Sequence, residues 1–250
     1  MTIDACCTVG VDREYALTPE ALVREMDFAG VDRAVVSSPD RCLAVSNREG
    51  NDSLFEAAHR FPDRLFPSCA ANPWYGRGAV EELRRALGLG ARMLVVAPSL
   101  QGFALSDELL DPLVAEAAVA RVPVYVHTGN PQGATPFELA LRARRHPELD
   151  WIMGHSGATD FWNDVQHAAR LAPNVYLESS FARPFIFRSH CSGVGFDRGI
   201  MGSGAPVSSL RFEWAEMRAV LEDLRAARAP GVDGVFGGNL LGLLGKRGPL

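Results

Sequence analysis

The chain has no apolar run of the ~18 residues that a membrane-spanning helix needs. Its first residues, Met1–Cys7, include neither the basic region nor the apolar region of a signal peptide. No basic face stands out and the net charge is −5, which disfavours nucleic-acid binding. The five cysteines show no Cys-x-x-Cys spacing, so reduced thiols are expected rather than a disulfide framework. We therefore expect a soluble cytoplasmic protein with neither nucleic acid nor membrane as a partner.

The chain is rich in short hydrophobic segments that alternate with amphipathic helical stretches. Most of these segments are nearly continuous apolar runs, as expected of parallel strands that are buried on both faces. The expected strands are Ile3–Val9, Arg33–Ser37, Leu65–Ala71, Arg92–Val96, Val122–His127, Leu149–Gly154, Asn174–Ser179 and Arg198–Gly202.

Helix signals separate these strands. Thr18 and Pro19 read as an N-cap and a first helical residue before Ala21–Phe28, and Gly30 follows as a helix stop. Further helices are expected over Ser106–Arg121, from Thr135 to before Pro147, and over Asp160–Leu171, Ser209–Ala227 and Gly234–Leu244.

Eight strand–helix units in 250 residues, 47% of them hydrophobic, predict an α/β protein that forms a single (β/α)8 TIM barrel over residues 1–250. A doubly wound open sheet is the second possibility. No Gly-x-Gly-x-x-Gly follows the first expected strand, which weakens a dinucleotide-binding form of that sheet.

Two histidines stand at or next to the ends of apolar strands. His127 ends Val122–His127, and His155 directly follows Leu149–Gly154. The carboxyl ends of barrel strands form the mouth in which TIM-barrel active sites lie, and imidazole there binds metals or transfers protons. Both histidines are therefore candidate site residues, and two hydrogen-bonded structural histidines are the alternative.

Several motifs occur together in a fixed order along the chain. Ile3–Ala5 opens the first strand, and Gly238 with Asn239 lies near the end. Between them lie Glu25–Val36, Phe61–Leu65, Val124–Gly129, Met153–Gly157 and Phe196–Ser203. In this order the motifs resemble the amidohydrolase superfamily, and more specifically the amidohydrolase-related branch that includes aminocarboxymuconate-semialdehyde decarboxylase. The resemblance covers essentially the whole chain and implies a TIM barrel.

The resemblance also implies a divalent metal at the barrel mouth. Its ligands would be two histidines of the first strand, one each of the fifth and sixth strands, and an aspartate of the eighth strand that also transfers protons. His127 and His155 match this pattern, whereas the first-strand positions hold Cys6 and Thr8 and the eighth-strand position holds Gly204. The metal site is therefore expected to be reduced to one divalent ion such as zinc, held by His127, His155 and Cys6, or to be absent.

Cys6 has three possible roles. A thiolate with imidazoles suits zinc, a thiol next to His155 can act as a nucleophile, and a buried free cysteine can simply pack. Glu178, near the end of the seventh strand, is the first candidate for the base that the missing aspartate would have supplied, although a salt-bridged or surface role is the common alternative. Asp4, deeper along the first strand, is a weaker candidate.

The remaining candidates would contact substrate at the mouth. Thr8 offers a hydroxyl, and Trp74 offers an aromatic surface on which a planar substrate can stack. Arg183 offers a cation that can bind a carboxylate. Ser203 lies in a glycine-rich loop whose backbone N–H groups can bind an anion. Packing, surface exposure or an ordinary turn is the alternative for each.

Two functions fit these residues. One is an amidohydrolase-like hydrolase or lyase of the decarboxylase or hydratase type, which acts on a small carboxylated or carbonyl-bearing substrate with a reduced or absent metal site. The other is a non-catalytic relative that binds a ligand or a partner. A homo-oligomer is compatible with either.

Overall fold

The computed structural model describes residues 1–129, 133–158 and 160–248. The expected domain, 1–250, also includes residues 130–132, 159, 249 and 250, which lie outside the described part. Each expected strand is present, although the third consists of two short pieces, β5 and β6. The strands are β1 (Ile3–Thr8), β4 (Arg33–Ser37), β5 (Leu65–Pro67), β6 (Cys69–Ala70), β7 (Leu94–Val96), β8 (Val124–His127), β9 (Trp151–Gly154), β10 (Val175–Glu178) and β11 (Gly199–Ile200).

These strands are parallel and run in two series, β1-β4-β5 and β6-β7-β8-β9-β10-β11. Ser68 joins them, because its N–H donates to Val36 in the first series while the next residue, Cys69, donates to Met93 beside β7. On the other side, Ala5 N–H donates to the Met201 carbonyl at 2.9 Å and Gly204 N–H donates to the Cys6 carbonyl at 2.9 Å. Backbone hydrogen bonds thus connect β1 to the segment after β11, and the TIM-barrel prediction is confirmed.

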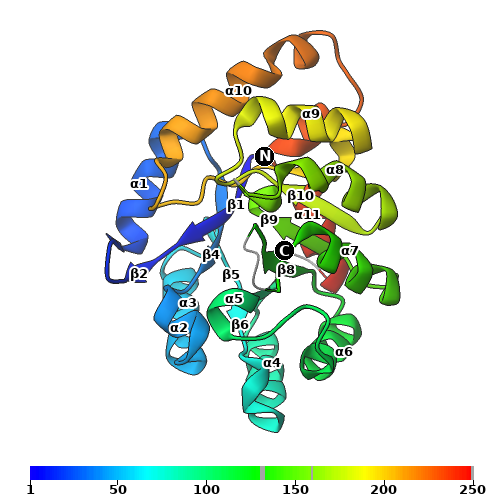
Figure 1. The fold of residues 1–250 in the computed structure, drawn as a ribbon. Helices are drawn as coiled ribbons and strands as arrows, with labels where there is room; N and C mark the ends of the chain where they lie inside the picture. The colour runs from blue at the N-terminus through cyan, green and yellow to red at the C-terminus, as the bar shows by residue number, and fades with distance from the viewer. Residues whose placement is uncertain (130–132, 159, 249–250) are drawn as a thin grey trace.

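Helices surround the strands, as Figure 1 shows. Thr18 caps the first helix with its side chain, and Thr135 forms a full capping box with Glu138. The longer helices are α1 (Pro19–Ala29), α3 (Asn47–Arg60), α4 (Arg77–Gly88), α6 (Asp111–Ala120), α7 (Pro136–Arg145), α8 (Trp162–Leu171), α9 (Pro184–Val194) and α10 (Leu210–Ala226). The shorter ones are α2 (Asp40–Ala44), α5 (Pro98–Gln101) and α11 (Gly238–Leu244). A small antiparallel hairpin, β2 (Gly10–Val11) with β3 (Ala16–Leu17), follows β1 and was not expected.

Two hydrophobic clusters hold this arrangement together. The larger packs the outward faces of the strands against the helices, and the smaller includes Ile3, Phe66, Ile152 and Ile200 with Leu240 of α11. Strand side chains alternate between the two clusters, as the pleat of a buried parallel strand requires. In the described part of the chain, no helix is long and apolar enough to span a membrane.

Candidate active site

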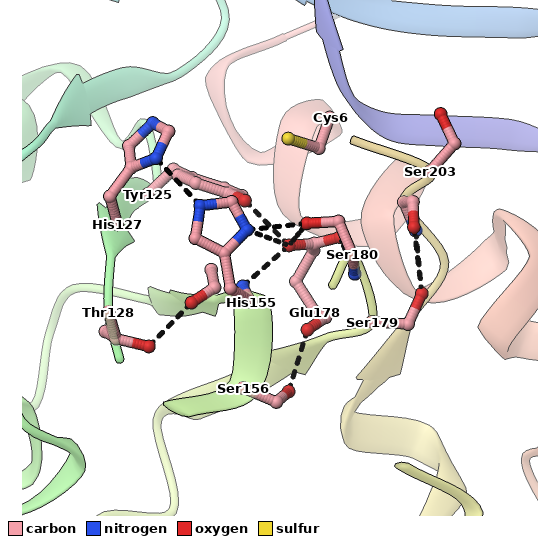
Figure 2. A network of polar contacts seen from close by, with 12 residues as sticks. Cys6, Tyr125, His127, Thr128, His155, Ser156, Glu178, Ser179, Ser180 and Ser203 are labelled. Atoms are coloured by element: carbon pink, nitrogen blue, oxygen red, sulfur yellow. Dashed lines mark hydrogen bonds and ion pairs between the residues drawn. The ribbon is translucent and has the colours of Figure 1, made fainter. Parts of the chain in front are cut away.

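His127 and His155 lie side by side where β8 and β9 end. His127 pairs with Gly154 in the register of the two strands, and His155 begins the short turn that follows β9. Nδ1 of His127 lies 2.8 Å from Nε2 of His155 (Figure 2). The two imidazoles therefore share one hydrogen bond at the carboxyl end of the barrel.

Both rings line a pocket of about 450 Å³ at this mouth. Its walls come from the ends of β8 and β9 and from the segments that follow β4 and β7. The strand ends of β8 and β9 contribute His127, Thr128, Gly129 and His155 to the lining. The segments after β4 and β7 contribute Asp40, Leu43, Ala97, Ser99 and Leu100.

Glu178, the last residue of β10, is fully buried behind the histidines. Its Oε2 accepts hydrogen bonds from the Tyr125 hydroxyl (2.6 Å), the His155 N–H (2.9 Å) and the Ser180 hydroxyl (2.7 Å), and its Oε1 accepts one from the Ser180 N–H (2.7 Å). Burial raises the pKa of the Glu178 carboxyl, and these donors act against that rise. Four donors aimed at two oxygens stabilise the ionised carboxylate.

With the Glu178 carboxyl ionised, the directions of the hydrogen bonds assign the tautomers of both histidines. The Ser180 hydroxyl donates to Glu178, so at 2.7 Å it must accept from Nδ1–H of His155. Nε2 of His155 then carries a lone pair and accepts from Nδ1–H of His127. The chain Glu178–Ser180–His155–His127 therefore leaves Nε2 of His127 unprotonated.

The surroundings also keep both rings neutral. Burial lowers the pKa of His155 to about 4, and burial together with the neighbouring His155 lowers the pKa of His127 to about 3. At neutral pH the pair is thus an uncharged hydrogen-bonded dyad, and Nε2 of His127 carries a lone pair.

These depressed pKa values predict an acid-sensitive fold. Each histidine binds a proton near pH 6.5 when unfolded but only near pH 3 to 4 when folded, so the stability that depends on neutral imidazole is complete above pH 6.5 and is lost as the pH falls. Between pH 6.5 and 4, the free energy of unfolding should fall more steeply in the wild type than in His127→Gln, by up to about 1.4 kcal/mol per pH unit. Urea titrations at several pH values measure both slopes, and equal slopes would contradict the assignment.

The backbone around His155 is held in an uncommon conformation. His155 (φ 65°), Ser156 (φ 39°) and Ala158 (φ 44°) are left-handed, which costs a non-glycine residue about 1–3 kcal/mol. The Ser156 hydroxyl donates to the Glu178 carbonyl at 2.7 Å, and the Thr128 hydroxyl donates to the Gly154 carbonyl at 2.6 Å. These bonds hold the His155 ring between His127 and Ser180.

Cys6 reaches the same network because β1 contains an irregularity between Asp4 and Cys7. The Cys6 N–H donates to the buried Asp4 carboxylate at 3.0 Å, while the sulfur is directed toward the histidine network in Figure 2. Burial, followed by the negative charge of Glu178, raises the pKa of the Cys6 thiol far above its usual range. Cys6 is therefore a protonated thiol in this environment and a poor nucleophile, whereas Cys7 packs in the larger hydrophobic cluster.

The structure brings none of the four expected substrate-contacting residues to the pocket wall, as far as the described residues show. Ser203 is fully buried, and its hydroxyl accepts from Ala205 N–H and faces the Cys7 sulfur at 3.8 Å. The Trp74 indole is 59% exposed and donates to the Gly102 carbonyl. Arg183 is exposed at the start of α9, and Thr8 lies at the end of β1, bonded through its N–H to Ala205.

Several residues of the site were absent from the sequence-based candidates, three of them with polar side chains central to it. Tyr125 and Ser180 complete the network around Glu178, and Asp40 lines the pocket. Strand alternation could have found Tyr125, which lies two residues before His127 and so shares its face. Asp40 had no such signal, since it opens a helix of five residues after β4.

A divalent metal requires ligand atoms that are free to bind it. Within the described residues, Cys6, His155 and Glu178 form one group whose ligand atoms all lie within 4.8 Å of one another, and His127 is outside that group. Both ring nitrogens of His155 and both oxygens of Glu178 already have hydrogen-bond partners, and the thiol would have to ionise against its raised pKa. Among the described residues, the buried polar side-chain atoms without partners all lie outside this group. In this arrangement the ligand atoms are held by hydrogen bonds within the network, so a divalent metal bound by this group would have to displace them.

At the eighth-strand position of the implied ligand set, the structure leaves little room for a side chain. Gly204 has φ +72°, and a Cβ at this position would lie 2.8 Å from the Phe181 ring. That ring is in turn tilted against His155, with centroids 4.8 Å apart. An aromatic side chain therefore occupies the space into which the implied aspartate would project.

We expect Gly204→Asp to destabilise the protein without creating a metal site. A side chain here meets both an unfavourable φ and the Phe181 ring, so Gly204→Ala and Gly204→Asp should each lower the free energy of unfolding by about 2–4 kcal/mol. Gly102→Ala is a matched control, because φ is +77° and the nearest atom is 3.8 Å away. It should cost only about 1 kcal/mol. Urea denaturation compares the three, and equal losses at the two glycines would refute a steric role for Phe181.

The comparisons with known proteins agree with this architecture. A family model described as amidohydrolase matches residues 11–222. A TIM-barrel protein of Bordetella bronchiseptica aligns over 99% of both chains with 19% identity and a TM-score of 0.75. A 5-carboxyvanillate decarboxylase of Novosphingobium aromaticivorans, solved with manganese, aligns over 98% of this chain and 96% of its own, with 17% identity and a TM-score of 0.76. A 2,6-dihydroxybenzoate decarboxylase from Rhizobium aligns over 99% of both chains with 18% identity and a TM-score of 0.73. No curated protein matches the sequence.

Proposed function

The chain belongs to the amidohydrolase family, and we propose that it is an enzyme that uses His127 as a general base on a small carboxylated or carbonyl-bearing substrate. The observation that carries this proposal is the one-way hydrogen-bond chain from Glu178 through Ser180 and His155 to His127. It orients an unprotonated imidazole nitrogen, and His127 itself lines a pocket of about 450 Å³. Positioned general bases contribute about 10²–10⁴-fold to a rate when their pKa lies near the working pH, so this proposal requires the pKa of His127 to rise from about 3 when substrate is bound.

During catalysis, a proton would move along this chain from His127 toward His155. When Nε2 of His127 takes a proton from water or substrate, Nδ1–H can pass its proton to Nε2 of His155. The positive charge then rests on His155, whose Nδ1 lies 3.9 Å from the Glu178 carboxylate. The Glu178 carboxylate would face that charge and contacts His155 rather than the pocket, so its proposed role is exerted through His155 and not on the substrate.

Two reaction classes use such a base. Hydrolysis needs a water activated beside a carbonyl carbon, and a lyase step needs a proton moved to or from carbon. The fold shared with two decarboxylases supports the lyase class and a carboxylated substrate. A panel of small aromatic and aliphatic carboxylates, esters, lactones and amides, followed by mass spectrometry, distinguishes the two by the product formed. Saturable ligand binding without any turnover would favour the non-catalytic relative.

We further propose that this chemistry proceeds without a metal bound by these residues. The protein, purified without chelator, should contain well below one equivalent of zinc, manganese or iron by elemental analysis, and chelator treatment should leave its activity unchanged, because the ligand atoms of Cys6, His155 and Glu178 are occupied. One equivalent of zinc that disappears in Cys6→Ser would refute this and would assign the metal to the group of Cys6, His155 and Glu178.

A further inference from the structure

Phe181 combines a large aromatic side chain with a left-handed backbone. Its φ is 59°, in a region that glycine adopts freely and in which a bulky residue is strained. The residue directly follows Ser180, whose hydroxyl bonds to both Glu178 and His155. Because a glycine at position 181 would avoid the strain, the reason for a phenylalanine here lies in what its side chain contacts.

The Phe181 ring bridges two segments of the barrel mouth. It is tilted at 43° against the imidazole of His155, with the ring centroids 4.8 Å apart. It also lies against Gly204, since two carbons of the ring are 2.8 Å and 2.9 Å from the position that a Cβ would take there. The ring fits this place only because Gly204 has no side chain. It therefore extends from the residue that follows β9 to the segment after β11.

The exposed fractions of the rings indicate which one faces solvent. His155 is 7% exposed, whereas Phe181 is 37% exposed. Among the described residues, the other rings next to His155 are those of Tyr125, which is buried, and His127, which is less exposed than Phe181. Phe181 is thus the aromatic residue that separates the imidazole of His155 from solvent.

The hydrogen bond beneath this cover joins Nδ1 of His155 to the Ser180 hydroxyl at 2.7 Å. Water that reached this bond would compete for both groups, and the surrounding dielectric would rise, so the bond would weaken. The imidazole of His155 could then turn away. Its Nε2 would no longer be held 2.8 Å from Nδ1 of His127, and the orientation of His127 in the pocket would be lost.

We propose that Phe181 is a positioning residue, whose ring keeps water from the bond between His155 and Ser180 and thereby holds His127 in its orientation for catalysis. The inference rests on the proposed function of His127. Phe181 is absent from the described lining of the histidine pocket, so it acts through His155 and not on the substrate. The missing side chain of Gly204 is part of the same arrangement, because it makes room for the ring.

Phe181→Gly tests this role, because glycine adopts a φ of 59° without strain and the change removes the ring alone. The first readout needs no substrate. In ¹⁵N-labelled protein, exchange of the His155 Nδ1–H with water, measured by NMR, should be at least about tenfold faster in Phe181→Gly than in the wild type. Phe181→Asn is a second variant without the ring, since asparagine also tolerates a left-handed backbone, and it should behave in the same way.

The second readout is steady-state kinetics on the substrate that the panel identifies. In Phe181→Gly, kcat should fall by about tenfold or more while KM stays within about twofold, because His127 loses its orientation and the pocket wall is unchanged. Phe181→Leu, which restores an apolar cover, should recover most of kcat and most of the slow exchange. A residue that only stabilised the fold would not separate kcat from KM in this way.

Arg121→Gly is the matched control. Arg121 is also left-handed, with φ 54°, and it is an exposed residue that ends α6 before β8 begins, at the opposite end of that strand from His127. Replacing it with glycine relieves the same kind of backbone strain and should leave both the exchange rate and kcat unaltered.

Unchanged exchange of the His155 Nδ1–H in folded Phe181→Gly and Phe181→Asn would overturn the proposal, and so would an equal fall of kcat in Arg121→Gly. The proposed function fails on a different result, namely full turnover in folded His127→Gln, whatever the exchange rate at His155. Faster exchange without any change in kcat would show that the ring covers His155 but does not position His127, which also overturns the proposal.

Discussion

His127→Gln is expected to lower kcat/KM by about 10²–10⁴-fold on whichever substrate the panel identifies. Glutamine can still donate from its amide to Nε2 of His155, so the hydrogen bond between the two residues can be kept. It has no basic nitrogen to replace Nε2 of His127, and the loss should therefore fall on kcat more than on the stability of the fold. Steady-state kinetics measures this, with circular dichroism to show that the variant is folded.

His167→Gln provides the matched control for this substitution. His167 is an exposed residue of α8, so the same chemical change there should leave kcat/KM unaltered. Full activity in a folded His127→Gln variant would refute the base assignment. A direct readout that needs no substrate is the ¹⁵N spectrum of the wild type, which should show His127 protonated at Nδ1 only.

The sequence predicted the parts of the site that follow from strand periodicity. A histidine that ends an apolar strand must reach the barrel mouth, and this places His127 and His155 on one rim. The same reasoning found Glu178, but it could not decide whether the carboxylate faces the interior or solvent. The structure gives the answer in its contacts, since Glu178 has no exposed surface and four donors.

Other parts of the site depend on local irregularities that a pattern of residue types does not encode. The family resemblance named Cys6, but strict alternation along β1 does not include the irregularity between Asp4 and Cys7 at which this residue joins the network. The left-handed conformations of His155 and Phe181 are equally invisible in sequence, although they place the two rings against each other. Asp40 comes from a short helix far from the histidines in the chain, and only the barrel fold brings it to their pocket.

Removal of the Glu178 carboxylate should lower the free energy of unfolding more than removal of any one of the donors that bind it. We expect Glu178→Gln to lower the free energy of unfolding by about 3 kcal/mol. If the amide oxygen takes the place of Oε2, it can accept from Tyr125, His155 and Ser180, but the NH₂ group then faces the Ser180 N–H that Oε1 had satisfied. Two donors facing each other in a buried site leave both without an acceptor.

Tyr125→Phe serves as the graded comparison, because it removes one of the four donors and keeps the ring. Its cost should be about 1 kcal/mol, since the carboxylate retains three hydrogen bonds. Urea denaturation at pH 7 ranks the two variants. Equal stabilities for wild type and Glu178→Gln would show that the carboxylate is not the centre of the network.

The same substitution tests the proton relay independently of stability. Without the carboxylate, the imidazolium that forms on His155 has no nearby anion, so the charged state becomes less favourable and kcat should fall while binding of a neutral ligand is retained. Tyr125→Phe, which leaves the carboxylate and its bond to Ser180 in place, should retain most of kcat. A variant Glu178→Gln that is folded, binds ligand and turns over at the wild-type rate would show that His127 works without support from Glu178.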